Sequence, residues 1–281
     1  MQTGKPRRFM NACLHCLVLL GPALLLSCTD PQAENGLAIK GSTTVLPIVQ
    51  VAAEVYMDRH PEAELSVQGG GSGVGIASLI DGTTRIATSS RRIKDQELVK
   101  ARESGITIHE TVIAMDGIAV VVNPSNNLQD LTIPQIRDIY TGAVSNWREL
   151  GGKDLKIVVL TRDTSSGTFE AFETLALDGE KVRPDALVTA SNQVVNMTVA
   201  QTPGAIGYLG FGYVSEVVRA VRIDGAAPGI QSIRSGRYPL SRPLYIYTRG
   251  MPAGEAKRFL DFLLSEEGQR LVREQGFIDV R

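Results

Sequence analysis

Histidine, cysteine and tryptophan are scarce in this sequence of 281 residues, which contains three His, three Cys and one Trp. His15 lies in an N-terminal segment discussed below, His60 precedes Pro61 in a predicted turn, and His109 lies in a polar segment. No group of His, Cys or acidic residues has the spacing of a metal site. The sequence therefore predicts no metal, no cofactor and no histidine-based catalysis.

An excess of charge of either sign is also missing. The chain has 29 Lys plus Arg against 30 Asp plus Glu, and loss of residues 1–27 would remove three basic and no acidic residues, which leaves 26 against 30. A nucleic-acid-binding protein would be clearly basic, so no nucleic-acid partner is expected. Any anion must be bound by local geometry rather than by net charge.

A long hydrophobic run is absent as well. The longest apolar stretch near the N-terminus, LVLLGPALLL, is too short to cross a bilayer comfortably and contains Pro22. It follows a basic segment with Lys5, Arg7 and Arg8 and ends shortly before Cys28. This pattern is typical of a secretory signal peptide, predicted here for residues 1–27.

The residues Leu25, Leu26 and Ser27 before Cys28 resemble a bacterial lipobox. The resemblance implies cleavage before Cys28 and attachment of lipid to its thiol. An ordinary signal peptide with an incidental cysteine is the alternative. Cys13 and Cys16 fall inside the signal, so Cys28 is the one cysteine left in the mature chain and cannot serve a disulfide framework. This favours the lipoprotein.

Beyond a polar tether at 28–36, strand-like and helix-like segments alternate, which is typical of an α/β protein with largely parallel strands. The predicted strands cover 37–40, 64–68, 85–88, 117–123 and 155–160, followed by AIGYL, VRAVRI and RPLYIYT. The predicted helices lie between Leu46 and Arg59, near 76–80, over 95–104 and 132–142, and from Ala253 onward.

Three loops between a predicted strand and a helix are rich in glycine and hydroxyl residues. They read KGSTTVLP (40–47), GGGSGVGIASL (69–79) and RDTSSGTFEAF (162–172). In a parallel sheet such loops meet at the carboxyl ends of the strands, where open α/β folds bind ligands. Helix N-termini and hydroxyls can together surround a tetrahedral oxyanion, and Arg162 adds a planar fork of donors. Ordinary helix capping is the alternative for each loop taken alone.

The ordered set of motifs resembles the phosphate-binding proteins of bacterial Pst-type ABC transporters, over 37–281. Besides the three loops, the matching segments are IATSSRRI, DGIAVVVNP, LTIPQIRDIYTGAVSNWRELGG, TPGAIGYLGFGY and SGRYPLSRPLYIYT. The resemblance implies a type II periplasmic-binding-protein fold, in which two lobes with mixed sheets and flanking helices are joined by a two-strand hinge. The first lobe would comprise 37–115 and 221–281, and the second 116–220.

The resemblance also implies a set of phosphate-binding residues. Arg162 would pair with the anion and Asp163 would hold Arg162 in place. Some family members have an acceptor Asp at the position of Ser90, so we hypothesise that Asp116 accepts the phosphate proton instead. The predicted set is Ser42, Thr43, Thr44, Ser72, Ser90, Arg91, Asp116, Arg162, Ser165, Ser166, Gly167 and Thr168.

The expected function is that of a monomeric, lipid-anchored extracytoplasmic protein that binds inorganic phosphate between its lobes and passes it to the permease of an ABC transporter. Binding of another oxyanion, such as sulfate or molybdate, is the alternative in the same class. A secreted serine hydrolase or phosphatase is the alternative in another class. It is disfavoured because Val74 interrupts the G-x-S-x-G pattern around Ser72 and Ile76 interrupts a phosphate-binding P-loop.

Overall fold

The computed structural model describes residues 36–281, so the predicted signal peptide, lipobox and nearly all of the tether lie outside the described part of the chain. The strands are β1 (Leu37–Gly41), β2 (Leu65–Gln68), β3 (Ile86–Ser89), β4 (Ile108–Val122), β5 (Asp130–Leu131), β6 (Val158–Arg162), β7 (Leu187–Thr189), β8 (Ala205–Gly210), β9 (Arg219–Ala220), β10 (Arg222–Ile223) and β11 (Ser241–Arg249). The helices are α1 (Leu46–Arg59), α2 (Ser72–Asp81), α3 (Asp95–Glu103), α4 (Ile133–Thr141), α5 (Gly167–Ala176), α6 (Asn192–Gln201), α7 (Ile230–Arg234), α8 (Gly254–Leu263) and α9 (Glu266–Glu274).

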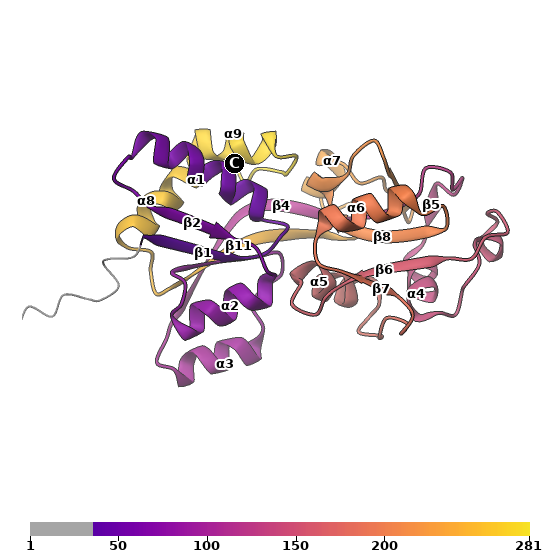
Figure 1. The fold of residues 1–281 in the computed structure, drawn as a ribbon, viewed down its shortest axis with the longest axis horizontal. Helices are drawn as coiled ribbons and strands as arrows, with labels where there is room; N and C mark the ends of the chain where they lie inside the picture. Colours follow the sequence, from indigo (N-terminus) through magenta and orange to yellow (C-terminus); the bar gives the residue numbers. More distant parts are fainter. Residues whose placement is uncertain (1–35) are drawn as a thin grey trace, which may run out of the picture. The chain divides into compact units, whose positions relative to one another are not determined.

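The long strand β4 joins the two halves of the fold. Its first part pairs antiparallel with β11, from Ile108 opposite Arg249 to Gly117 opposite Ser241. Its second part pairs antiparallel with β8, beginning with Ile118 opposite Gly210. The full strand order is β2-β1-β3-β11-β4-β8-β6-β7, with β9 also beside β4, and Figure 1 shows β4 and β11 running between the two groups of helices.

The sequence predicted only the second part of β4, from Gly117 onward, whereas the strand begins at Ile108. The first part begins with the consecutive polar residues His109, Glu110 and Thr111, and Ile108–Val112 are not buried, so it lacks the pattern of a buried strand. The second part is a continuous buried run, which is much easier to recognise.

We call β4 and β11 the hinge strands. The first lobe consists of β1–β3, α1–α3, α8 and α9 with the adjoining parts of these two strands. β1 pairs in parallel with β2 and with β3. One face of this sheet packs on α1, α8 and α9, through side chains such as Ile48, Phe259 and Val272. The other face packs on α2 through Ile76 and Leu79. Both faces are therefore covered, as a parallel arrangement requires.

The second lobe contains β5–β10 and α4–α7. β6 pairs in parallel with β7 and β8, and its two faces pack on α4 with α5 and on α6. Phe172 stacks on Tyr208 in the core, with ring centroids 3.9 Å apart. Trp147 is buried beside them and donates from Nε1 to the Gly204 carbonyl at 3.0 Å. Trp147 thus packs structurally.

The boundary of the second lobe differs from the predicted one. We expected the chain to return to the first lobe at Val221, but Val221, Ile233 and Leu240 pack in the core of the second lobe. β10 pairs in parallel with β5 of the same lobe. The segment VRAVRI, predicted as one strand, forms the two short strands β9 and β10. The return takes place about twenty residues later, at β11.

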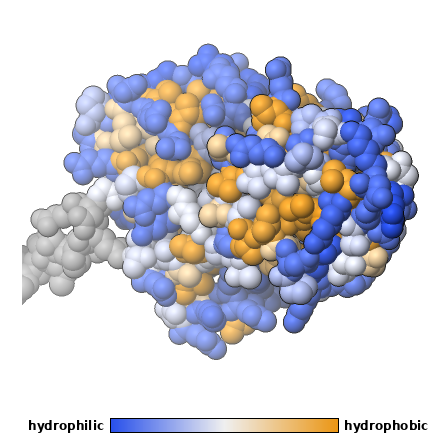
Figure 2. Space-filling view, turned by 45° about the vertical axis from the view of Figure 1, so that its right-hand side comes forward, coloured by the Kyte–Doolittle hydropathy of each residue, from blue (hydrophilic) through white to orange (hydrophobic). Residues whose placement is uncertain are grey.

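Exposed hydrophobic residues are spread over several elements, among them β7 (Val188), α6 (Met197) and the segment before α8 (Met251). The face drawn in Figure 2 shows hydrophobic areas interrupted by hydrophilic residues. Scattered exposed apolar residues are common on soluble proteins. Between Gly36 and Arg281, no helix is both long and apolar enough to cross a bilayer.

Candidate site between the lobes

Four buried hydroxyl groups from both lobes meet beside the hinge strands. Thr44 Oγ1 and Thr168 Oγ1 lie 2.9 Å apart. Ser90 Oγ lies 3.5 Å from both Ser72 Oγ and Thr168 Oγ1, and Ser72 Oγ accepts a hydrogen bond from the Ser90 N–H at 3.1 Å. Each of the four residues is at most 1% exposed. We call these four residues the hydroxyl cluster. It brings together residues from all three predicted loops and from the end of β3.

Helix N-termini surround the hydroxyl cluster. α2 begins at Ser72 and α5 at Gly167, while α1 begins two residues after Thr44. The first N–H groups of a helix have no partner within the helix, and the dipole makes this end positive. Ser166 caps α5 by accepting from the Phe169 N–H at 3.3 Å, and Ser42 Oγ accepts from the Thr44 N–H at 3.1 Å. These two serines therefore shape the loops.

Gly167 allows the close approach of the two lobes. A Cβ atom at this position would lie 2.2 Å from Ser72 Oγ and 2.9 Å from Ser90 Oγ. Such distances are far below van der Waals contact, so a side chain here would push the loops apart. The glycine predicted from the loop motif thus has a steric reason.

Arg162, at the end of β6, is only 2% exposed and contacts both lobes. Nη2 donates to Thr43 Oγ1 at 3.0 Å in the first lobe. Nε donates to the Thr189 carbonyl at 3.2 Å and Nη1 to Asn192 Oδ1 at 3.3 Å in the second. Burial lowers the pKa of Arg162, yet an arginine remains protonated in proteins. The site therefore contains a fixed positive charge.

Asp163 does less for Arg162 than predicted. Its nearest oxygen lies 4.0 Å from Arg162 Nη2, whereas its Oδ1 accepts from the Ser165 N–H at 3.0 Å. The Thr189 carbonyl and the side-chain amide of Asn192 hold the guanidinium instead. Asp163 chiefly organises the loop that precedes α5.

Arg242 is a second buried arginine, and the sequence reasoning missed it. Its Nη2 donates to Thr168 Oγ1 at 3.0 Å and its Nη1 to the Ser90 carbonyl at 3.0 Å. Nε and Nη2 both donate to Asp116 Oδ2, at 3.1 and 2.8 Å. Arg242 lies within the quoted motif SGRYPLSRPLYIYT, where an arginine in an otherwise apolar strand was the available signal.

Asp116 is fully buried on β4 beside the hydroxyl cluster. Besides Arg242, it accepts from the Phe211 N–H at 3.0 Å through Oδ1. Burial raises the pKa of Asp116, and the contact with Arg242 and the hydrogen bonds from backbone N–H groups oppose that rise. The carboxylate thus already has protein donors on both oxygens, and its role as acceptor of a phosphate proton stays a prediction.

Asn192, the first residue of α6, also belongs to the site although no motif indicated it. Its Nδ2 donates to Thr44 Oγ1 at 3.1 Å, and its Oδ1 accepts from Arg162 Nη1 and from the Gly210 N–H at 3.2 Å. It is fully buried. Asn192 connects the guanidinium of the second lobe with a hydroxyl of the first.

Two other predicted residues lie beside the hydroxyl cluster rather than in it. Ser165 bridges the lobes, because its Oγ donates to the Gly70 carbonyl at 2.9 Å and its carbonyl accepts from the Gly73 N–H at 3.0 Å. The Arg91 guanidinium pairs with Glu97 and Glu170 instead of joining the cluster. The prediction of Arg91 as a direct ligand thus finds no support in its contacts.

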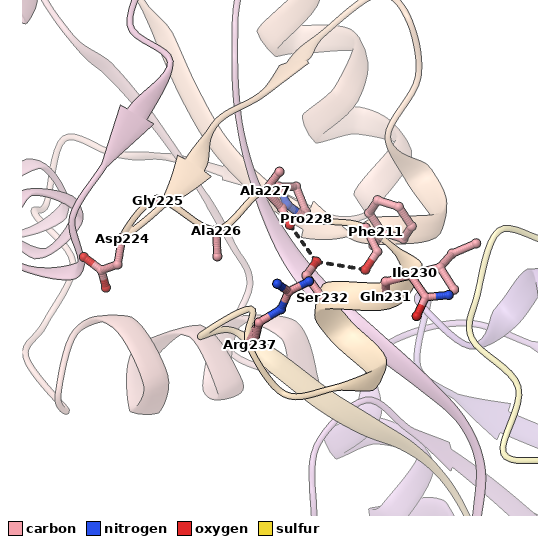
Figure 3. A pocket seen from close by; sticks show the side chains of 11 residues that line it. Phe211, Asp224, Gly225, Ala226, Ala227, Pro228, Ile230, Gln231, Ser232 and Arg237 are labelled. Atoms are coloured by element: carbon pink, nitrogen blue, oxygen red, sulfur yellow. Dashed lines mark hydrogen bonds between the residues drawn. The ribbon is translucent and has the colours of Figure 1, made fainter.

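A cavity of about 910 Å³ lies elsewhere, against the loop 224–229 and α7 of the second lobe. Figure 3 shows Asp224, Ser232 and Arg237 along its walls, and Ser232 Oγ donates to the Ala227 carbonyl at 2.6 Å. It borders Phe211 but contains none of the predicted phosphate-binding residues. Buried polar groups, rather than this cavity, therefore identify the candidate site. Among residues 36–281, no group of three or more His, Cys, Asp or Glu side chains could hold a metal ion.

Comparisons with known proteins give the family. The model of the PBP superfamily domain matches residues 29–267. The phosphate-binding protein PstS of Bacillus subtilis is 38% identical over 253 residues, which cover 89% of this chain and 83% of that protein.

Two solved structures are similar over most of the chain. An ABC-type phosphate transport receptor from Vibrio cholerae has a TM-score of 0.74 and 38% identity, and the match covers 86% of this chain and 99% of that one. A candidate phosphate ABC transporter substrate-binding protein from Clostridium perfringens, solved with bound phosphate, has a TM-score of 0.82 and 35% identity. That match covers 88% of this chain and 100% of the other. The chain therefore belongs to the PBP superfamily and, within it, to the family of PstS-type phosphate-binding proteins.

Proposed function

We propose that this protein binds inorganic phosphate between its lobes and delivers it to the permease of an ABC transporter. The observation that carries the proposal is the pair of buried arginines, Arg162 and Arg242, each of which donates to a hydroxyl group at the junction of the two lobes. Arg162, Arg242 and the buried carboxylate Asp116 together carry one net positive charge, to which the helix N-termini add. This is the electrostatic complement of a small anion.

The relatives support phosphate as that anion. PstS of Bacillus subtilis is named for phosphate binding, and the structure from Clostridium perfringens contains phosphate. The match to the PBP superfamily domain spans residues 29–267, a range that contains every member of the hydroxyl cluster.

The contacts of the serines disfavour the enzyme alternative. A serine nucleophile needs a general base within hydrogen-bonding reach. Within residues 36–281, Ser72 and Ser90 hydrogen-bond to hydroxyl and backbone groups and to no His or carboxylate. The relatives are likewise substrate-binding proteins. We therefore propose a binding protein that leaves its ligand chemically unchanged.

Thermal unfolding with a panel of anions tests the binding function. A ligand that binds only the folded state stabilises it by about 2.7 kcal/mol at a hundredfold excess over its Kd. Phosphate should therefore raise the Tm of the protein by several degrees, whereas an amino acid or a sugar should not. A shift with sulfate but none with phosphate would assign another oxyanion. Steady hydrolysis of p-nitrophenyl phosphate that is lost in Ser72→Ala would favour an enzyme.

We further propose that the protein is held at the extracytoplasmic face of the membrane by lipid on Cys28. The support is the sequence pattern alone, since this residue lies outside the described part of the chain. Cys28→Ser should abolish the lipid and release the protein from the membrane fraction, with phosphate binding intact because every proposed ligand contact lies downstream. Membrane retention of Cys28→Ser after a carbonate wash would contradict a lipid anchor as the sole attachment.

A further inference from the structure

A second set of contacts between the lobes is made by charged groups beside the hydroxyl cluster. Glu170 lies in the first turn of α5, in the second lobe. Its Oε2 is 2.7 Å from Arg91 Nε and 2.5 Å from Lys94 Nζ. Both partners belong to the first lobe, where they lie between β3 and α3. One carboxylate of the second lobe therefore meets two cations of the first.

Arg91 is fixed from its own lobe for this contact. Its Nη1 and Nη2 donate to the two oxygens of Glu97, at 2.8 and 2.6 Å. Glu97 in turn accepts from the Lys94 N–H at 2.8 Å, which completes the cap of α3. The guanidinium is therefore held in position by its own lobe, and its contact with Glu170 is an ion pair rather than a hydrogen bond. Little side-chain entropy is then lost when Glu170 arrives.

The bridge is largely shielded from water. The side chains of Arg91 and Glu170 are 7% and 11% exposed, and that of Lys94 is 52% exposed. Ion pairs that are partly buried are screened less by salt than surface pairs. The same three residues line a cavity of about 400 Å³ whose walls also include Ser90 and Arg242 of the candidate site. The bridge thus lies beside the proposed ligand.

We propose that the bridge from Glu170 to Arg91 and Lys94 stabilises the closed arrangement of the lobes and so slows the release of phosphate. The inference rests on the proposed function, since release is defined only if phosphate binds. When the lobes separate, Glu170 loses both of its cationic partners. It lies near the positive end of α5, so its unpaired negative charge then repels a bound anion. Closure and anion binding therefore support each other through this contact.

Lys94→Met tests the bridge at its exposed end, where a folding defect is not expected. The dissociation rate of labelled inorganic phosphate, chased with unlabelled phosphate, should rise about fivefold. A change of this size is what the loss of one partly exposed ion pair causes. The association rate should change less than twofold. Lys94→Arg, which keeps the charge, should restore slow release.

Arg92→Met is the matched control. Arg92 is an equally charged neighbour that lines the same cavity, but its side chain is 77% exposed and its ion pair, at 3.5 Å from Nε, is with Glu110 on β4 rather than with Glu170. This variant loses the same charge and should keep the parental dissociation rate. In a Glu170→Gln background, the extra effect of Lys94→Met should disappear.

Two outcomes would overturn the bridge while leaving the proposed function in place. One is that Lys94→Met and Arg92→Met release phosphate at the same rate. The other is that the effect of Lys94→Met persists in full in the Glu170→Gln background. Failure of the parent protein to bind phosphate would instead contradict the proposed function itself.

Discussion

Arg162→Ala should weaken phosphate binding by about 2–5 kcal/mol, since it removes a buried, charge-assisted donor from a site that excludes water. The guanidinium is held at three of its nitrogens, by a hydroxyl of the first lobe and by a backbone carbonyl and a side-chain amide oxygen of the second. Calorimetric titration with phosphate measures the loss directly. Arg162→Lys should recover only part of the affinity, because a point charge lacks the planar fork.

Arg148→Ala provides a control for the change in net charge, since Arg148 is in the second lobe with its side chain 65% exposed. It should bind phosphate like the parent. If Arg162→Ala instead lowers stability but keeps near-parental affinity, Arg162 serves only to hold the loop between β7 and α6, and its assignment as a ligand is wrong.

Arg242→Met should lower the free energy of unfolding by about 3–5 kcal/mol, because it leaves the fully buried Asp116 without its counterion. Urea unfolding without phosphate measures this cost. The double variant Arg242→Met, Asp116→Asn removes both charges and should regain much of the stability. We expect neither variant to bind phosphate tightly, since Arg242 also donates to Thr168 within the hydroxyl cluster.

This pair of variants separates structure from function. If the double variant regained both stability and phosphate affinity, Arg242 would act only as the partner of Asp116. Recovery of stability without recovery of affinity would show that the pair takes part in binding, and Asp116→Asn alone would then separate the contribution of Asp116 from that of Arg242.

The three loops were predictable because each has a local signature. Glycines and hydroxyls at the start of a helix indicate a loop that can bind an anion. The contact of Thr44 with Thr168, and the link from Thr168 through Ser90 to Ser72, follow from placing those loops at one edge of the sheets. The fold class followed from the alternation of strands and helices together with the ordered motifs. These signals depend on residues close together in the sequence.

Arg242 and Asn192 were missed because their roles depend on pairing between distant segments. Arg242 reaches Asp116 from 126 positions away, across neighbouring hinge strands. Asn192 reaches Thr44 over 148 positions and looks like an ordinary residue at the start of a helix. Arg91 follows Ser90 in the sequence, but its side chain pairs with Glu97 and Glu170, so its role as a phosphate ligand stays a prediction.

A crystal structure of the protein grown with phosphate tests the central claim most directly. We expect one phosphate between the lobes, with oxygens within hydrogen-bonding distance of the Arg162 guanidinium and of hydroxyls in the cluster formed by Thr44, Ser72, Ser90 and Thr168. Phosphate found only outside this site, for example beside Arg237 in the cavity of the second lobe, would contradict the account.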